Sequence, residues 1–263
     1  MLQYFLKEYL RERPLFLALI RAKEAQLYQK YIPLKKPVLD VGCGDGFFVK
    51  VTFGQGRTLS GSDPNQLDVG LDLKGSRIDE AKNLVVYKKL VTYDGRKIPF
   101  PNNYFSTVVS NCVLEHVEHL DLILKEIQRV IKPGGVFLTS VMAKPWEDNL
   151  FGAILFGTWY QDWMRKKQIH LNLFTKQQWD KLFTKLGFEI EDSFGYLSPQ
   201  ACRLIDLSHY LSAPNLISYK LFGKWVLFPE ITQYIYPIKY FSSVLSQKVS
   251  ADKSGTIFYV LRK

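Results

Sequence analysis

Three glycines at alternate positions, Gly42, Gly44 and Gly46, directly follow the short apolar run PVLDV at residues 37–41. The apolar run, with its β-branched residues, predicts a buried strand, and the glycines predict a tight turn after it. Such a turn lets the backbone approach a ligand closely, and a helix starting near Asp45 would direct its first N–H groups there. The pattern indicates recognition of a nucleotide-like cofactor, although it also occurs in purely structural turns.

An acidic residue lies near the end of the second predicted strand, 67–73, where Asp72 precedes a predicted helix in SRIDEAKN. A carboxylate there can accept hydrogen bonds from both hydroxyls of a ribose. Asp63 in GSDPNQ is the alternative, because it lies nearer the usual distance of about 20 residues from the glycine turn. Asp72 is preferred because residues 62–66 are rich in turn formers, which makes residues 54–66 an insertion.

Strands and helices alternate along the middle of the chain. Predicted strands over 84–93 and 104–110 end at Asp94-Gly95 and at Asn111. Apolar residues at helical spacing then cover 117–131, a Lys-Pro-Gly-Gly turn follows, and a further strand spans 136–142. Because the carboxyl ends of parallel strands meet at one edge of a sheet, these polar residues should gather beside the glycine turn. This order of elements predicts a doubly wound α/β domain.

Four stretches together resemble the successive motifs of class I S-adenosylmethionine-dependent methyltransferases: LDVGCGDG, VGLDLKGSRIDEAK, DGRKIPFPNNYFSTVVSNCVLEHV and LKEIQRVIKPGGVFL. The resemblance covers about residues 37–142 and resumes at FTKQQWDKLFTKLGFEI. It implies a Rossmann-like, seven-stranded sheet whose last strand is antiparallel, and TIFYVLRK is the candidate for that strand. It also implies S-adenosyl-L-methionine as the cofactor and methyl transfer as the reaction.

Carried onto this sequence, the resemblance implies which residues meet the cofactor. By this resemblance, the methionine side of the cofactor meets Asp40, Gly42, Cys43 and Gly44, and the ribose meets Asp72. The adenine meets Asp94 and Gly95. The end of the fourth strand contributes Asn111 with Cys112. The separation between the glycine turn and Asp72 is longer than the family pattern. For this reason Asp63 stays open as the ribose residue.

Two histidines are candidate catalytic residues. Transfer of a sulfonium methyl group mainly needs an aligned acceptor and exclusion of water, and a general base helps when the acceptor is a hydroxyl, phenol or enolic carbon. His116 in VLEHVEHL follows the fourth predicted strand, and His170 in QIHLNLFT lies in a segment that often closes over the acceptor in similar enzymes. The alternative for each is a histidine that only packs locally. No spacing typical of a metal site is present, so no metal is expected.

Composition restricts the class and the location of the protein. The 263 residues, 47% hydrophobic and 23% charged, suffice for an ordinary buried core. The three cysteines are scattered, which favours a reducing, cytoplasmic location over a disulfide framework. The amino-terminal residues lack the apolar region of a signal peptide, and the nearly uncharged stretch 150–161 is too short to span a membrane.

The net charge of +10 comes from residues 1–37 and 151–263, while residues 38–150 are close to neutral. A continuous basic stripe or an Arg-rich helix is missing, so a nucleic acid is not expected as a partner. The basic flanks fit either a solvated surface or an anionic partner, such as a membrane or a charged substrate. Aromatic residues interleaved with lysines after residue 194 fit a helical subdomain around an apolar acceptor, or contact of a peripheral protein with a membrane surface.

We therefore expect a cytoplasmic methyltransferase that transfers a methyl group in line to a small-molecule or lipid-like acceptor. The alternatives are a non-catalytic cofactor-binding protein with a regulatory or assembly role, and an NAD-dependent oxidoreductase. The oxidoreductase would require a glycine where Phe47 stands. We expect one domain over residues 1–263. Its parts are a helical cap (1–36), the cofactor-binding core (37–142), a substrate-side segment with a helix and the sixth strand (143–196), an aromatic insertion or lid (197–254) and the final strand (255–263).

Overall fold

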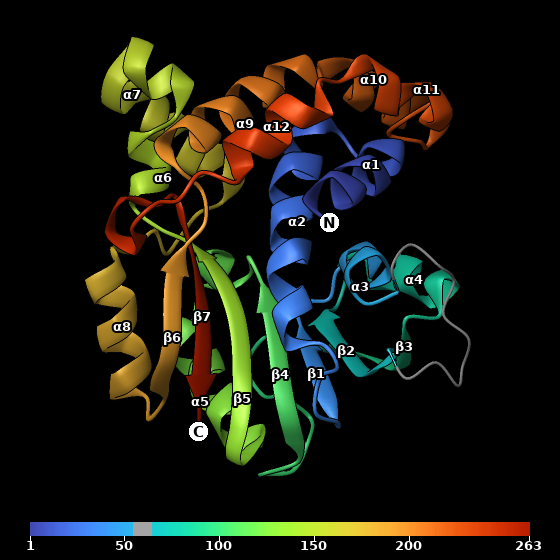
Figure 1. The fold of residues 1–263 in the computed structure, drawn as a ribbon. Coiled ribbons are helices and arrows are strands. Elements are labelled where there is room, and N and C mark those ends of the chain that lie inside the picture. The colour runs from blue at the N-terminus through green and yellow to red at the C-terminus, as the bar shows by residue number, and fades with distance from the viewer. Residues whose placement is uncertain (55–64) are drawn as a thin grey trace. The chain divides into compact units, whose positions relative to one another are not determined.

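The computed structural model describes residues 1–54 and 65–263, which form two compact units (Figure 1). The sheet unit comprises Tyr31–Ala143, Ile169–Phe194 and Ile257–Lys263. The helical unit comprises Met1–Lys30, Lys144–Gln168 and Gly195–Thr256. Each unit is thus assembled from three separate stretches of the chain. The single domain expected from the sequence stays a prediction.

Seven strands form one sheet in the order β3-β2-β1-β4-β5-β7-β6. Their bounds are β1 Val38–Val41, β2 Leu67–Leu73, β3 Tyr87–Tyr93, β4 Phe105–Asn111, β5 Ile131–Met142, β6 Glu189–Gly195 and β7 Thr256–Arg262. Strands β3, β2, β1, β4 and β5 run parallel to one another. Strands β2 and β3 lie on one side of β1, and β4 and β5 lie on its other side, so the order of the strands reverses at β1. A crevice at such a switch point is the usual ligand site of this architecture.

The last strand runs against its neighbour β5. The N–H of Gly134, near the start of β5, donates to the carbonyl oxygen of Lys263 at 2.8 Å, and the N–H of Lys263 donates to Gly135 at 3.1 Å. The start of β5 therefore faces the end of β7, and the two arrows point in opposite directions in Figure 1. This confirms the predicted Rossmann-like sheet of seven strands with TIFYVLRK as its antiparallel strand.

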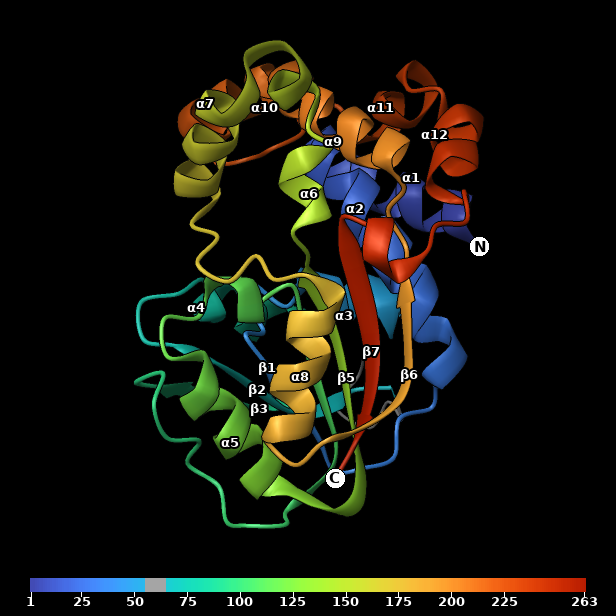
Figure 2. The ribbon, with the colours of Figure 1, turned by 90° about the vertical axis from the view of Figure 1, so that its left-hand side faces the viewer.

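Four α-helices belong to the sheet unit, namely α3 Phe47–Thr52, α4 Ile78–Ala81, α5 Leu120–Val130 and α8 Lys176–Lys185. Helices α5 and α8 lie side by side on one face of the sheet (Figure 2). The buried side of α5 includes Leu120, Ile123 and Ile127, the helical repeat seen in the sequence. Helix α8 begins with a capping box between Thr175 and Gln178.

Some element boundaries differ from the sequence-based expectation for local reasons. The strand expected over 84–93 begins only at Tyr87, because Val85 has a left-handed φ of +53° after the short 3-10 turn Lys82–Leu84. The helix expected from residue 117 begins at Leu120, because Val117 has extended backbone. The Lys-Pro-Gly-Gly segment lies within β5, where it coincides with a register shift against β4. It is an irregularity of the strand rather than a separate turn.

The helical unit contains α1 Leu2–Glu12, α2 Leu15–Tyr28, α6 Pro145–Asp148, α7 Phe151–Gln168, α9 Pro199–Leu211, α10 Ala213–Phe222, α11 Pro229–Ile235 and α12 Ile238–Leu245. Two buried carboxylates connect these helices. Glu24 of α2 accepts a hydrogen bond from the hydroxyl of Tyr196 at 2.8 Å. Asp206 of α9 accepts from the hydroxyl of Tyr160 at 2.7 Å and from the N–H of Gly152 at 3.0 Å, both at α7. The expected amino-terminal helices and helical insertion are thus both present.

Candidate active site

The glycine turn after β1 is fastened to the end of β2. The N–H groups of Gly42 and Cys43 both donate to the carbonyl oxygen of Leu71, at 2.8 and 3.2 Å. Gly42 has a φ of +76°, and a Cβ at this position would lie 2.5 Å from the side chain of Val113. Glycine is therefore required for the turn to approach the segment that follows β4.

The carboxylate of Asp72 joins β2 to this turn. Its Oδ2 accepts a hydrogen bond from the N–H of Gly44 at 2.6 Å, and its Oδ1 accepts from the N–H of Leu73 at 2.7 Å. Each carboxylate oxygen retains a lone pair, so Asp72 can also accept hydrogen bonds from a ligand. Its alternative from the sequence, Asp63, lies outside the residues that the structure describes.

A cavity of about 530 Å³ opens where β1, β2, β3 and β4 end. Its wall includes the last residues of β2 and β3 and the residues that directly follow β1 and β4, as the parallel order of the sheet requires. The residues include Gly42, Asp72, Tyr93, Asp94, Gly95 and Cys112. Polar groups that are far apart in the sequence are in this way brought around one hollow.

One wall of the cavity combines an apolar side chain with a polar turn. Leu73 is 49% exposed beside the cavity, and a Cβ on Gly95 would lie 3.0 Å from it. Oδ1 of Asp94 accepts hydrogen bonds from the N–H groups of Arg96 and Lys97, at 2.9 and 3.3 Å, and these bonds lower the pKa of Asp94. This wall offers an apolar surface next to an ionised carboxylate, which suits the face and edge of an adenine ring.

Asp40 does not line this cavity. Its side chain is buried and accepts a hydrogen bond from the hydroxyl of Tyr87 at 2.5 Å. Loss of hydration is the largest effect on this carboxyl and raises its pKa to about 7, although the Tyr87 hydrogen bond acts in the opposite direction. Asp40 thus holds the core beneath the glycine turn, with a proton that it can lose near neutral pH.

The nine residues expected around the cofactor divide into two groups. Those that line the cavity are Gly42, Asp72, Asp94, Gly95 and Cys112. Those that do not are Asp40, Cys43, Gly44 and Asn111. Gly44 acts through its N–H on Asp72, and burial is the main reason why the pKa of the Cys43 thiol is raised.

Asn111 supports the turn at the end of β4. Its Oδ1 accepts a hydrogen bond from the hydroxyl of Ser140 at 2.7 Å, and the carbonyl of Ser140 accepts from the N–H of Cys112 at 3.0 Å. Cys112 has a left-handed φ of +51°, an uncommon conformation for a residue with a side chain. Ser140 of β5 therefore holds both residues of the turn, and Cys112 reaches the cavity wall.

The two candidate histidines lie against each other. The ring centroids of His116 and His170 are 5.1 Å apart. Nδ1 of His116 lies 3.0 Å from the carbonyl oxygen of Ile169, and because a carbonyl only accepts, this hydrogen bond requires a proton on Nδ1. Neutral His116 then has its lone pair on Nε2. His116 is exposed and lines the cavity, whereas His170 is buried and does not.

Backbone hydrogen bonds join the two segments that carry these histidines. The carbonyl of Glu115 accepts from the N–H groups of Leu171 and Asn172, at 2.8 and 3.0 Å. The side-chain amide of Asn172 donates to the carbonyls of Leu114 and Val117, at 2.9 and 2.7 Å. The segment after β4 is thus held in place by residues 169–172, and Leu171 lines the cavity.

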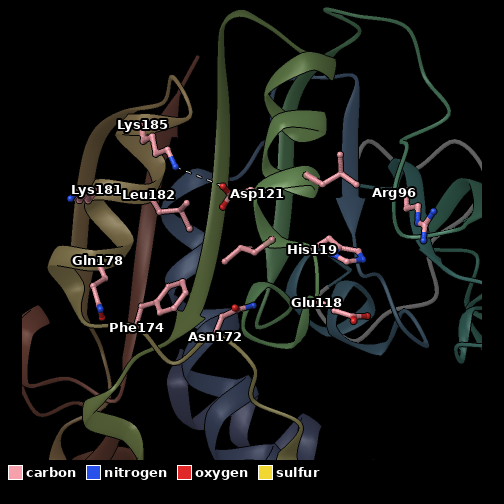
Figure 3. A pocket seen from close by; sticks show the side chains of 12 residues that line it. Arg96, Glu118, His119, Asp121, Asn172, Phe174, Gln178, Lys181, Leu182 and Lys185 are labelled. Carbon is pink, nitrogen blue, oxygen red and sulfur yellow. Dashed lines mark ion pairs between the residues drawn. The ribbon is translucent and has the colours of Figure 1, made fainter.

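A second, open groove of about 820 Å³ lies between the start of α5 and helix α8. In Figure 3, Leu182 of α8 points toward Asp121 at the start of α5, whereas Lys181 points away. Lys185 and Asp121 form an ion pair at 3.9 Å. The groove shares Arg96, Glu118 and His119 with the first cavity, so the two hollows adjoin.

Sequence reasoning missed several residues of the cavity wall. Tyr93 and Val113 were within reach, because each is next to a residue that was expected at a strand end. Leu73 follows the expected ribose residue directly. Arg96 likewise follows the expected Gly95, whereas Glu118 and Leu171 carry no such signal, because only the folded chain brings them to the cavity.

A family model described as a methyltransferase domain matches residues 3–193, which is most of the chain. The chain belongs to this methyltransferase family. The methyl donor of the class I family is S-adenosyl-L-methionine. The family assignment confirms the methyltransferase resemblance that the motifs of the sequence indicated.

Individual proteins resemble parts of the chain. The ubiquinone/menaquinone biosynthesis C-methyltransferase of Burkholderia multivorans is 32% identical over 114 residues, which are 42% of this chain and 44% of that protein. The sterol 4-C-methyltransferase of Caenorhabditis elegans is 32% identical over 108 residues, 40% of this chain and 31% of that protein. The chain therefore spans less than half the length of these curated relatives.

The fold itself extends over most of the chain. The crystal structure of the [4+2]-cyclase SpnF superposes with a TM-score of 0.58 at 18% identity, and covers 92% of this chain and 80% of that one. At this level of identity the likeness is one of fold. A fold of this kind serves more than one chemistry, so the reaction has to be argued from the site.

The residues around the cavity fit S-adenosyl-L-methionine. The Asp72 carboxylate supplies acceptors for two ribose hydroxyls, and the half-exposed Leu73 supplies an apolar surface that an adenine ring would cover. The positive φ at Gly42 brings backbone rather than a side chain to the wall.

Proposed function

We propose that this protein transfers the methyl group of S-adenosyl-L-methionine to a small-molecule or lipid-like acceptor. The observation that carries the proposal is the cavity at the ends of β1 to β4, with the Asp72 carboxylate fixed to the glycine turn at its wall. The names of the relatives support the acceptor class, since one is a quinone-biosynthesis and one a sterol methyltransferase.

The proposed roles of the cofactor residues follow from their positions. Asp72 accepts from the ribose hydroxyls, while Leu73 and the turn at Asp94-Gly95 receive the adenine. The turn at 42–44 receives the methionine part, with Asp40 beneath it, and Asn111 maintains the wall at Cys112 through Ser140. When bound, the sulfonium supplies a methyl group that is already activated for attack. The chain itself has to orient the acceptor and exclude water.

His116 is the proposed proton acceptor for an acceptor group that must lose a proton. It lines the cavity, and the Ile169 carbonyl leaves the lone pair on Nε2. His170 packs against its ring from the buried side. Its proposed part is to hold the His116 ring in place, and a direct part in catalysis would require it to become exposed to the cavity.

A cytoplasmic location is proposed with this function. The three cysteines, Cys43, Cys112 and Cys202, are buried free thiols. Free thiols persist in a reducing compartment. Alkylation of the thiols in protein unfolded directly from cells would test this, since three reactive thiols are expected and an oxidised pair would oppose it.

The function is tested by incubating the protein with methyl-labelled S-adenosylmethionine and either a lipid extract or an aqueous metabolite extract. We expect label to enter an organic-soluble product, and Asp72→Ala to lower the transfer at limiting cofactor concentration. Label in the aqueous fraction would indicate a polar acceptor. Cofactor binding without transfer to either extract would favour the non-catalytic alternative, and binding of NAD instead would favour the oxidoreductase.

A further inference from the structure

Large apolar side chains are exposed on the outer helices of the helical unit. On α7 they are Phe151, Ile154, Leu155, Phe156, Trp159 and Trp163. On α10, α11 and the loop between them they include Leu221, Phe222, Phe228, Ile231, Tyr234 and Ile235. Single exposed apolar residues are ordinary, but several close together in the sequence of one helix or loop mark an interaction site.

After a break at Gly157, where φ is +60° and ψ is −143°, helix α7 carries apolar residues on two of its sides. Tyr160 and Met164 are buried, and the Tyr160 hydroxyl donates to Asp206 of α9, so one side is fixed inside the unit. Trp159, one residue away, is 66% exposed and stacks in parallel with Trp163 at a centroid distance of 6.5 Å. Because large apolar side chains on the surface of a helix are normally covered, the outer side of α7 is a candidate contact surface.

Helix α10 and the loop after it repeat this arrangement. Ser218 is buried and its hydroxyl donates to the carbonyl of Lys224 at 2.6 Å, which folds the loop back onto the helix. Leu221 and Phe222 at the end of α10 are nevertheless 70% and 62% exposed. The exposure therefore belongs to an ordered helix end, and it is not the result of a frayed terminus.

The charges among these side chains are mainly basic, although Asp162 of α7 is an exposed acid. Residues 207–229 contain Lys220 and Lys224 but no Asp or Glu. At the end of α7 the ammonium group of Lys167 lies 4.5 Å from the centroid of the Trp163 ring, next to exposed Lys166. Glu230 on α11 is paired with Arg11. Aromatic rings beside lysines match the depth of lipid headgroups, with ammonium groups on the phosphates.

We propose that these faces of α7, α10 and α11 dock the protein on the surface of a bilayer that contains anionic lipids. The rings would enter the headgroup layer, and the lysines would pair with phosphates and carboxylates of the lipids. In the part of the chain that the structure describes, no helix is both long and apolar enough to cross a membrane. The contact is therefore one of adsorption to the surface.

The test is flotation of the full chain with vesicles of phosphatidylcholine, with and without phosphatidylserine, at low and high salt. We expect binding to the anionic vesicles that weakens with salt. Lys220→Gln with Lys224→Gln should lower vesicle affinity roughly tenfold to thirtyfold. The matched control, Lys82→Gln with Lys125→Gln on the sheet unit, makes the same charge change and should leave affinity unchanged.

The apolar contribution is tested with Phe156→Ser and Trp159→Ser together. This pair should abolish flotation, while Tyr104→Ser, an exposed aromatic of the sheet unit, should not. Both proteins should bind S-adenosylhomocysteine with the same affinity as the unchanged chain, which shows that they are folded and separates this proposal from the proposed function. Brominated lipids should quench tryptophan fluorescence, and loss of Trp159 should remove much of that quenching.

Absence of flotation at low salt would overturn the proposal. So would flotation that the two aromatic replacements leave unchanged. Analytical ultracentrifugation tests whether a second copy of the chain binds to this surface instead. A stable dimer that the same aromatic replacements dissociate would assign these faces to self-association and contradict membrane docking.

Discussion

The Oδ2 atom of Asp72 lies 2.6 Å from the backbone nitrogen of Gly44, which places a carboxylate from the end of β2 directly on the turn that follows β1. The contact joins residues that are 28 positions apart. The same carboxylate organises the turn and faces the cavity.

Replacing Asp72 with Ala should weaken the affinity for S-adenosylhomocysteine roughly tenfold to a hundredfold, because hydrogen bonds to a charged group are lost. The affinity of Asp72→Asn should lie between that of the unchanged chain and that of Asp72→Ala, since its amide oxygen can still accept a hydrogen bond from the N–H of Gly44. Isothermal titration calorimetry measures this. Asp63→Ala serves as the comparison, and a larger loss of affinity in that variant would transfer the ribose role to Asp63.

Replacing Gly42 with Ala should destabilise the protein by about 2 kcal/mol or more, through positive-φ strain and overlap with Val113. Gly134→Ala is the control, because Gly134 also has a positive φ but open space around its Cβ position. It should cost only about 1 kcal/mol. Urea unfolding measures both. Adding Val113→Ala should restore part of the loss in Gly42→Ala, and no restoration would argue against the overlap.

The raised pKa of Asp40, about 7 in the folded protein, predicts a dependence of stability on pH. The folded state retains a proton that the unfolded state has lost, so this group's stabilising contribution is complete below about pH 4. It decreases as the pH rises to about 7, by at most about 1.4 kcal/mol per pH unit. Urea unfolding across this range should show a smaller decrease in Asp40→Asn, which can still accept from Tyr87. Equal decreases would mean that Asp40 is ionised throughout.

Asp206 should contribute strongly to the helical unit, because its buried carboxylate holds both Gly152 and Tyr160 of α7. Asp206→Ala leaves these two donors without their acceptor and should lower the free energy of unfolding by roughly 2–5 kcal/mol. Thermal and urea unfolding measure the loss. Asp162→Ala, an exposed acid on α7, should change stability by less than about 0.5 kcal/mol. Similar effects of the two changes would contradict the assigned role.

The positions of the histidines predict different effects on turnover once an acceptor is known. His116→Gln should lower the rate roughly a hundredfold if the acceptor must lose a proton, with unchanged affinity for S-adenosylhomocysteine. His170→Gln should act indirectly, by altering the pH dependence of the rate that His116 produces. A His116→Gln variant that keeps its full rate would remove this residue from the chemistry.

The sheet was predictable because its strands carry simple patterns. The bounds of β2 coincide with the predicted strand 67–73, since alternating apolar residues end at a turn former. Other boundaries depend on the backbone conformation of a single residue. Val85, for example, has a left-handed conformation, which β-branched residues rarely adopt. Periodicity alone contains no information about such positions.

The site was predictable only in part, for a similar reason. Residues at strand ends, such as Asp72 and Asp94, follow from strand order. His170 does not, because burial against His116 depends on contacts made between segments distant in the sequence. The prediction for the aromatic residues after Gly195 was limited in the same way, since composition does not separate a buried ring such as Phe241 from an exposed one such as Phe222.

The account rests on the cavity at the ends of β1 to β4 being the site of S-adenosyl-L-methionine. Calorimetric titration of the full chain with S-adenosylhomocysteine, with NAD as the control ligand, tests this most directly. We expect one molecule of S-adenosylhomocysteine to bind per chain, with a micromolar Kd, and NAD to give no heat of binding. Binding of NAD, or of neither ligand, would contradict the account.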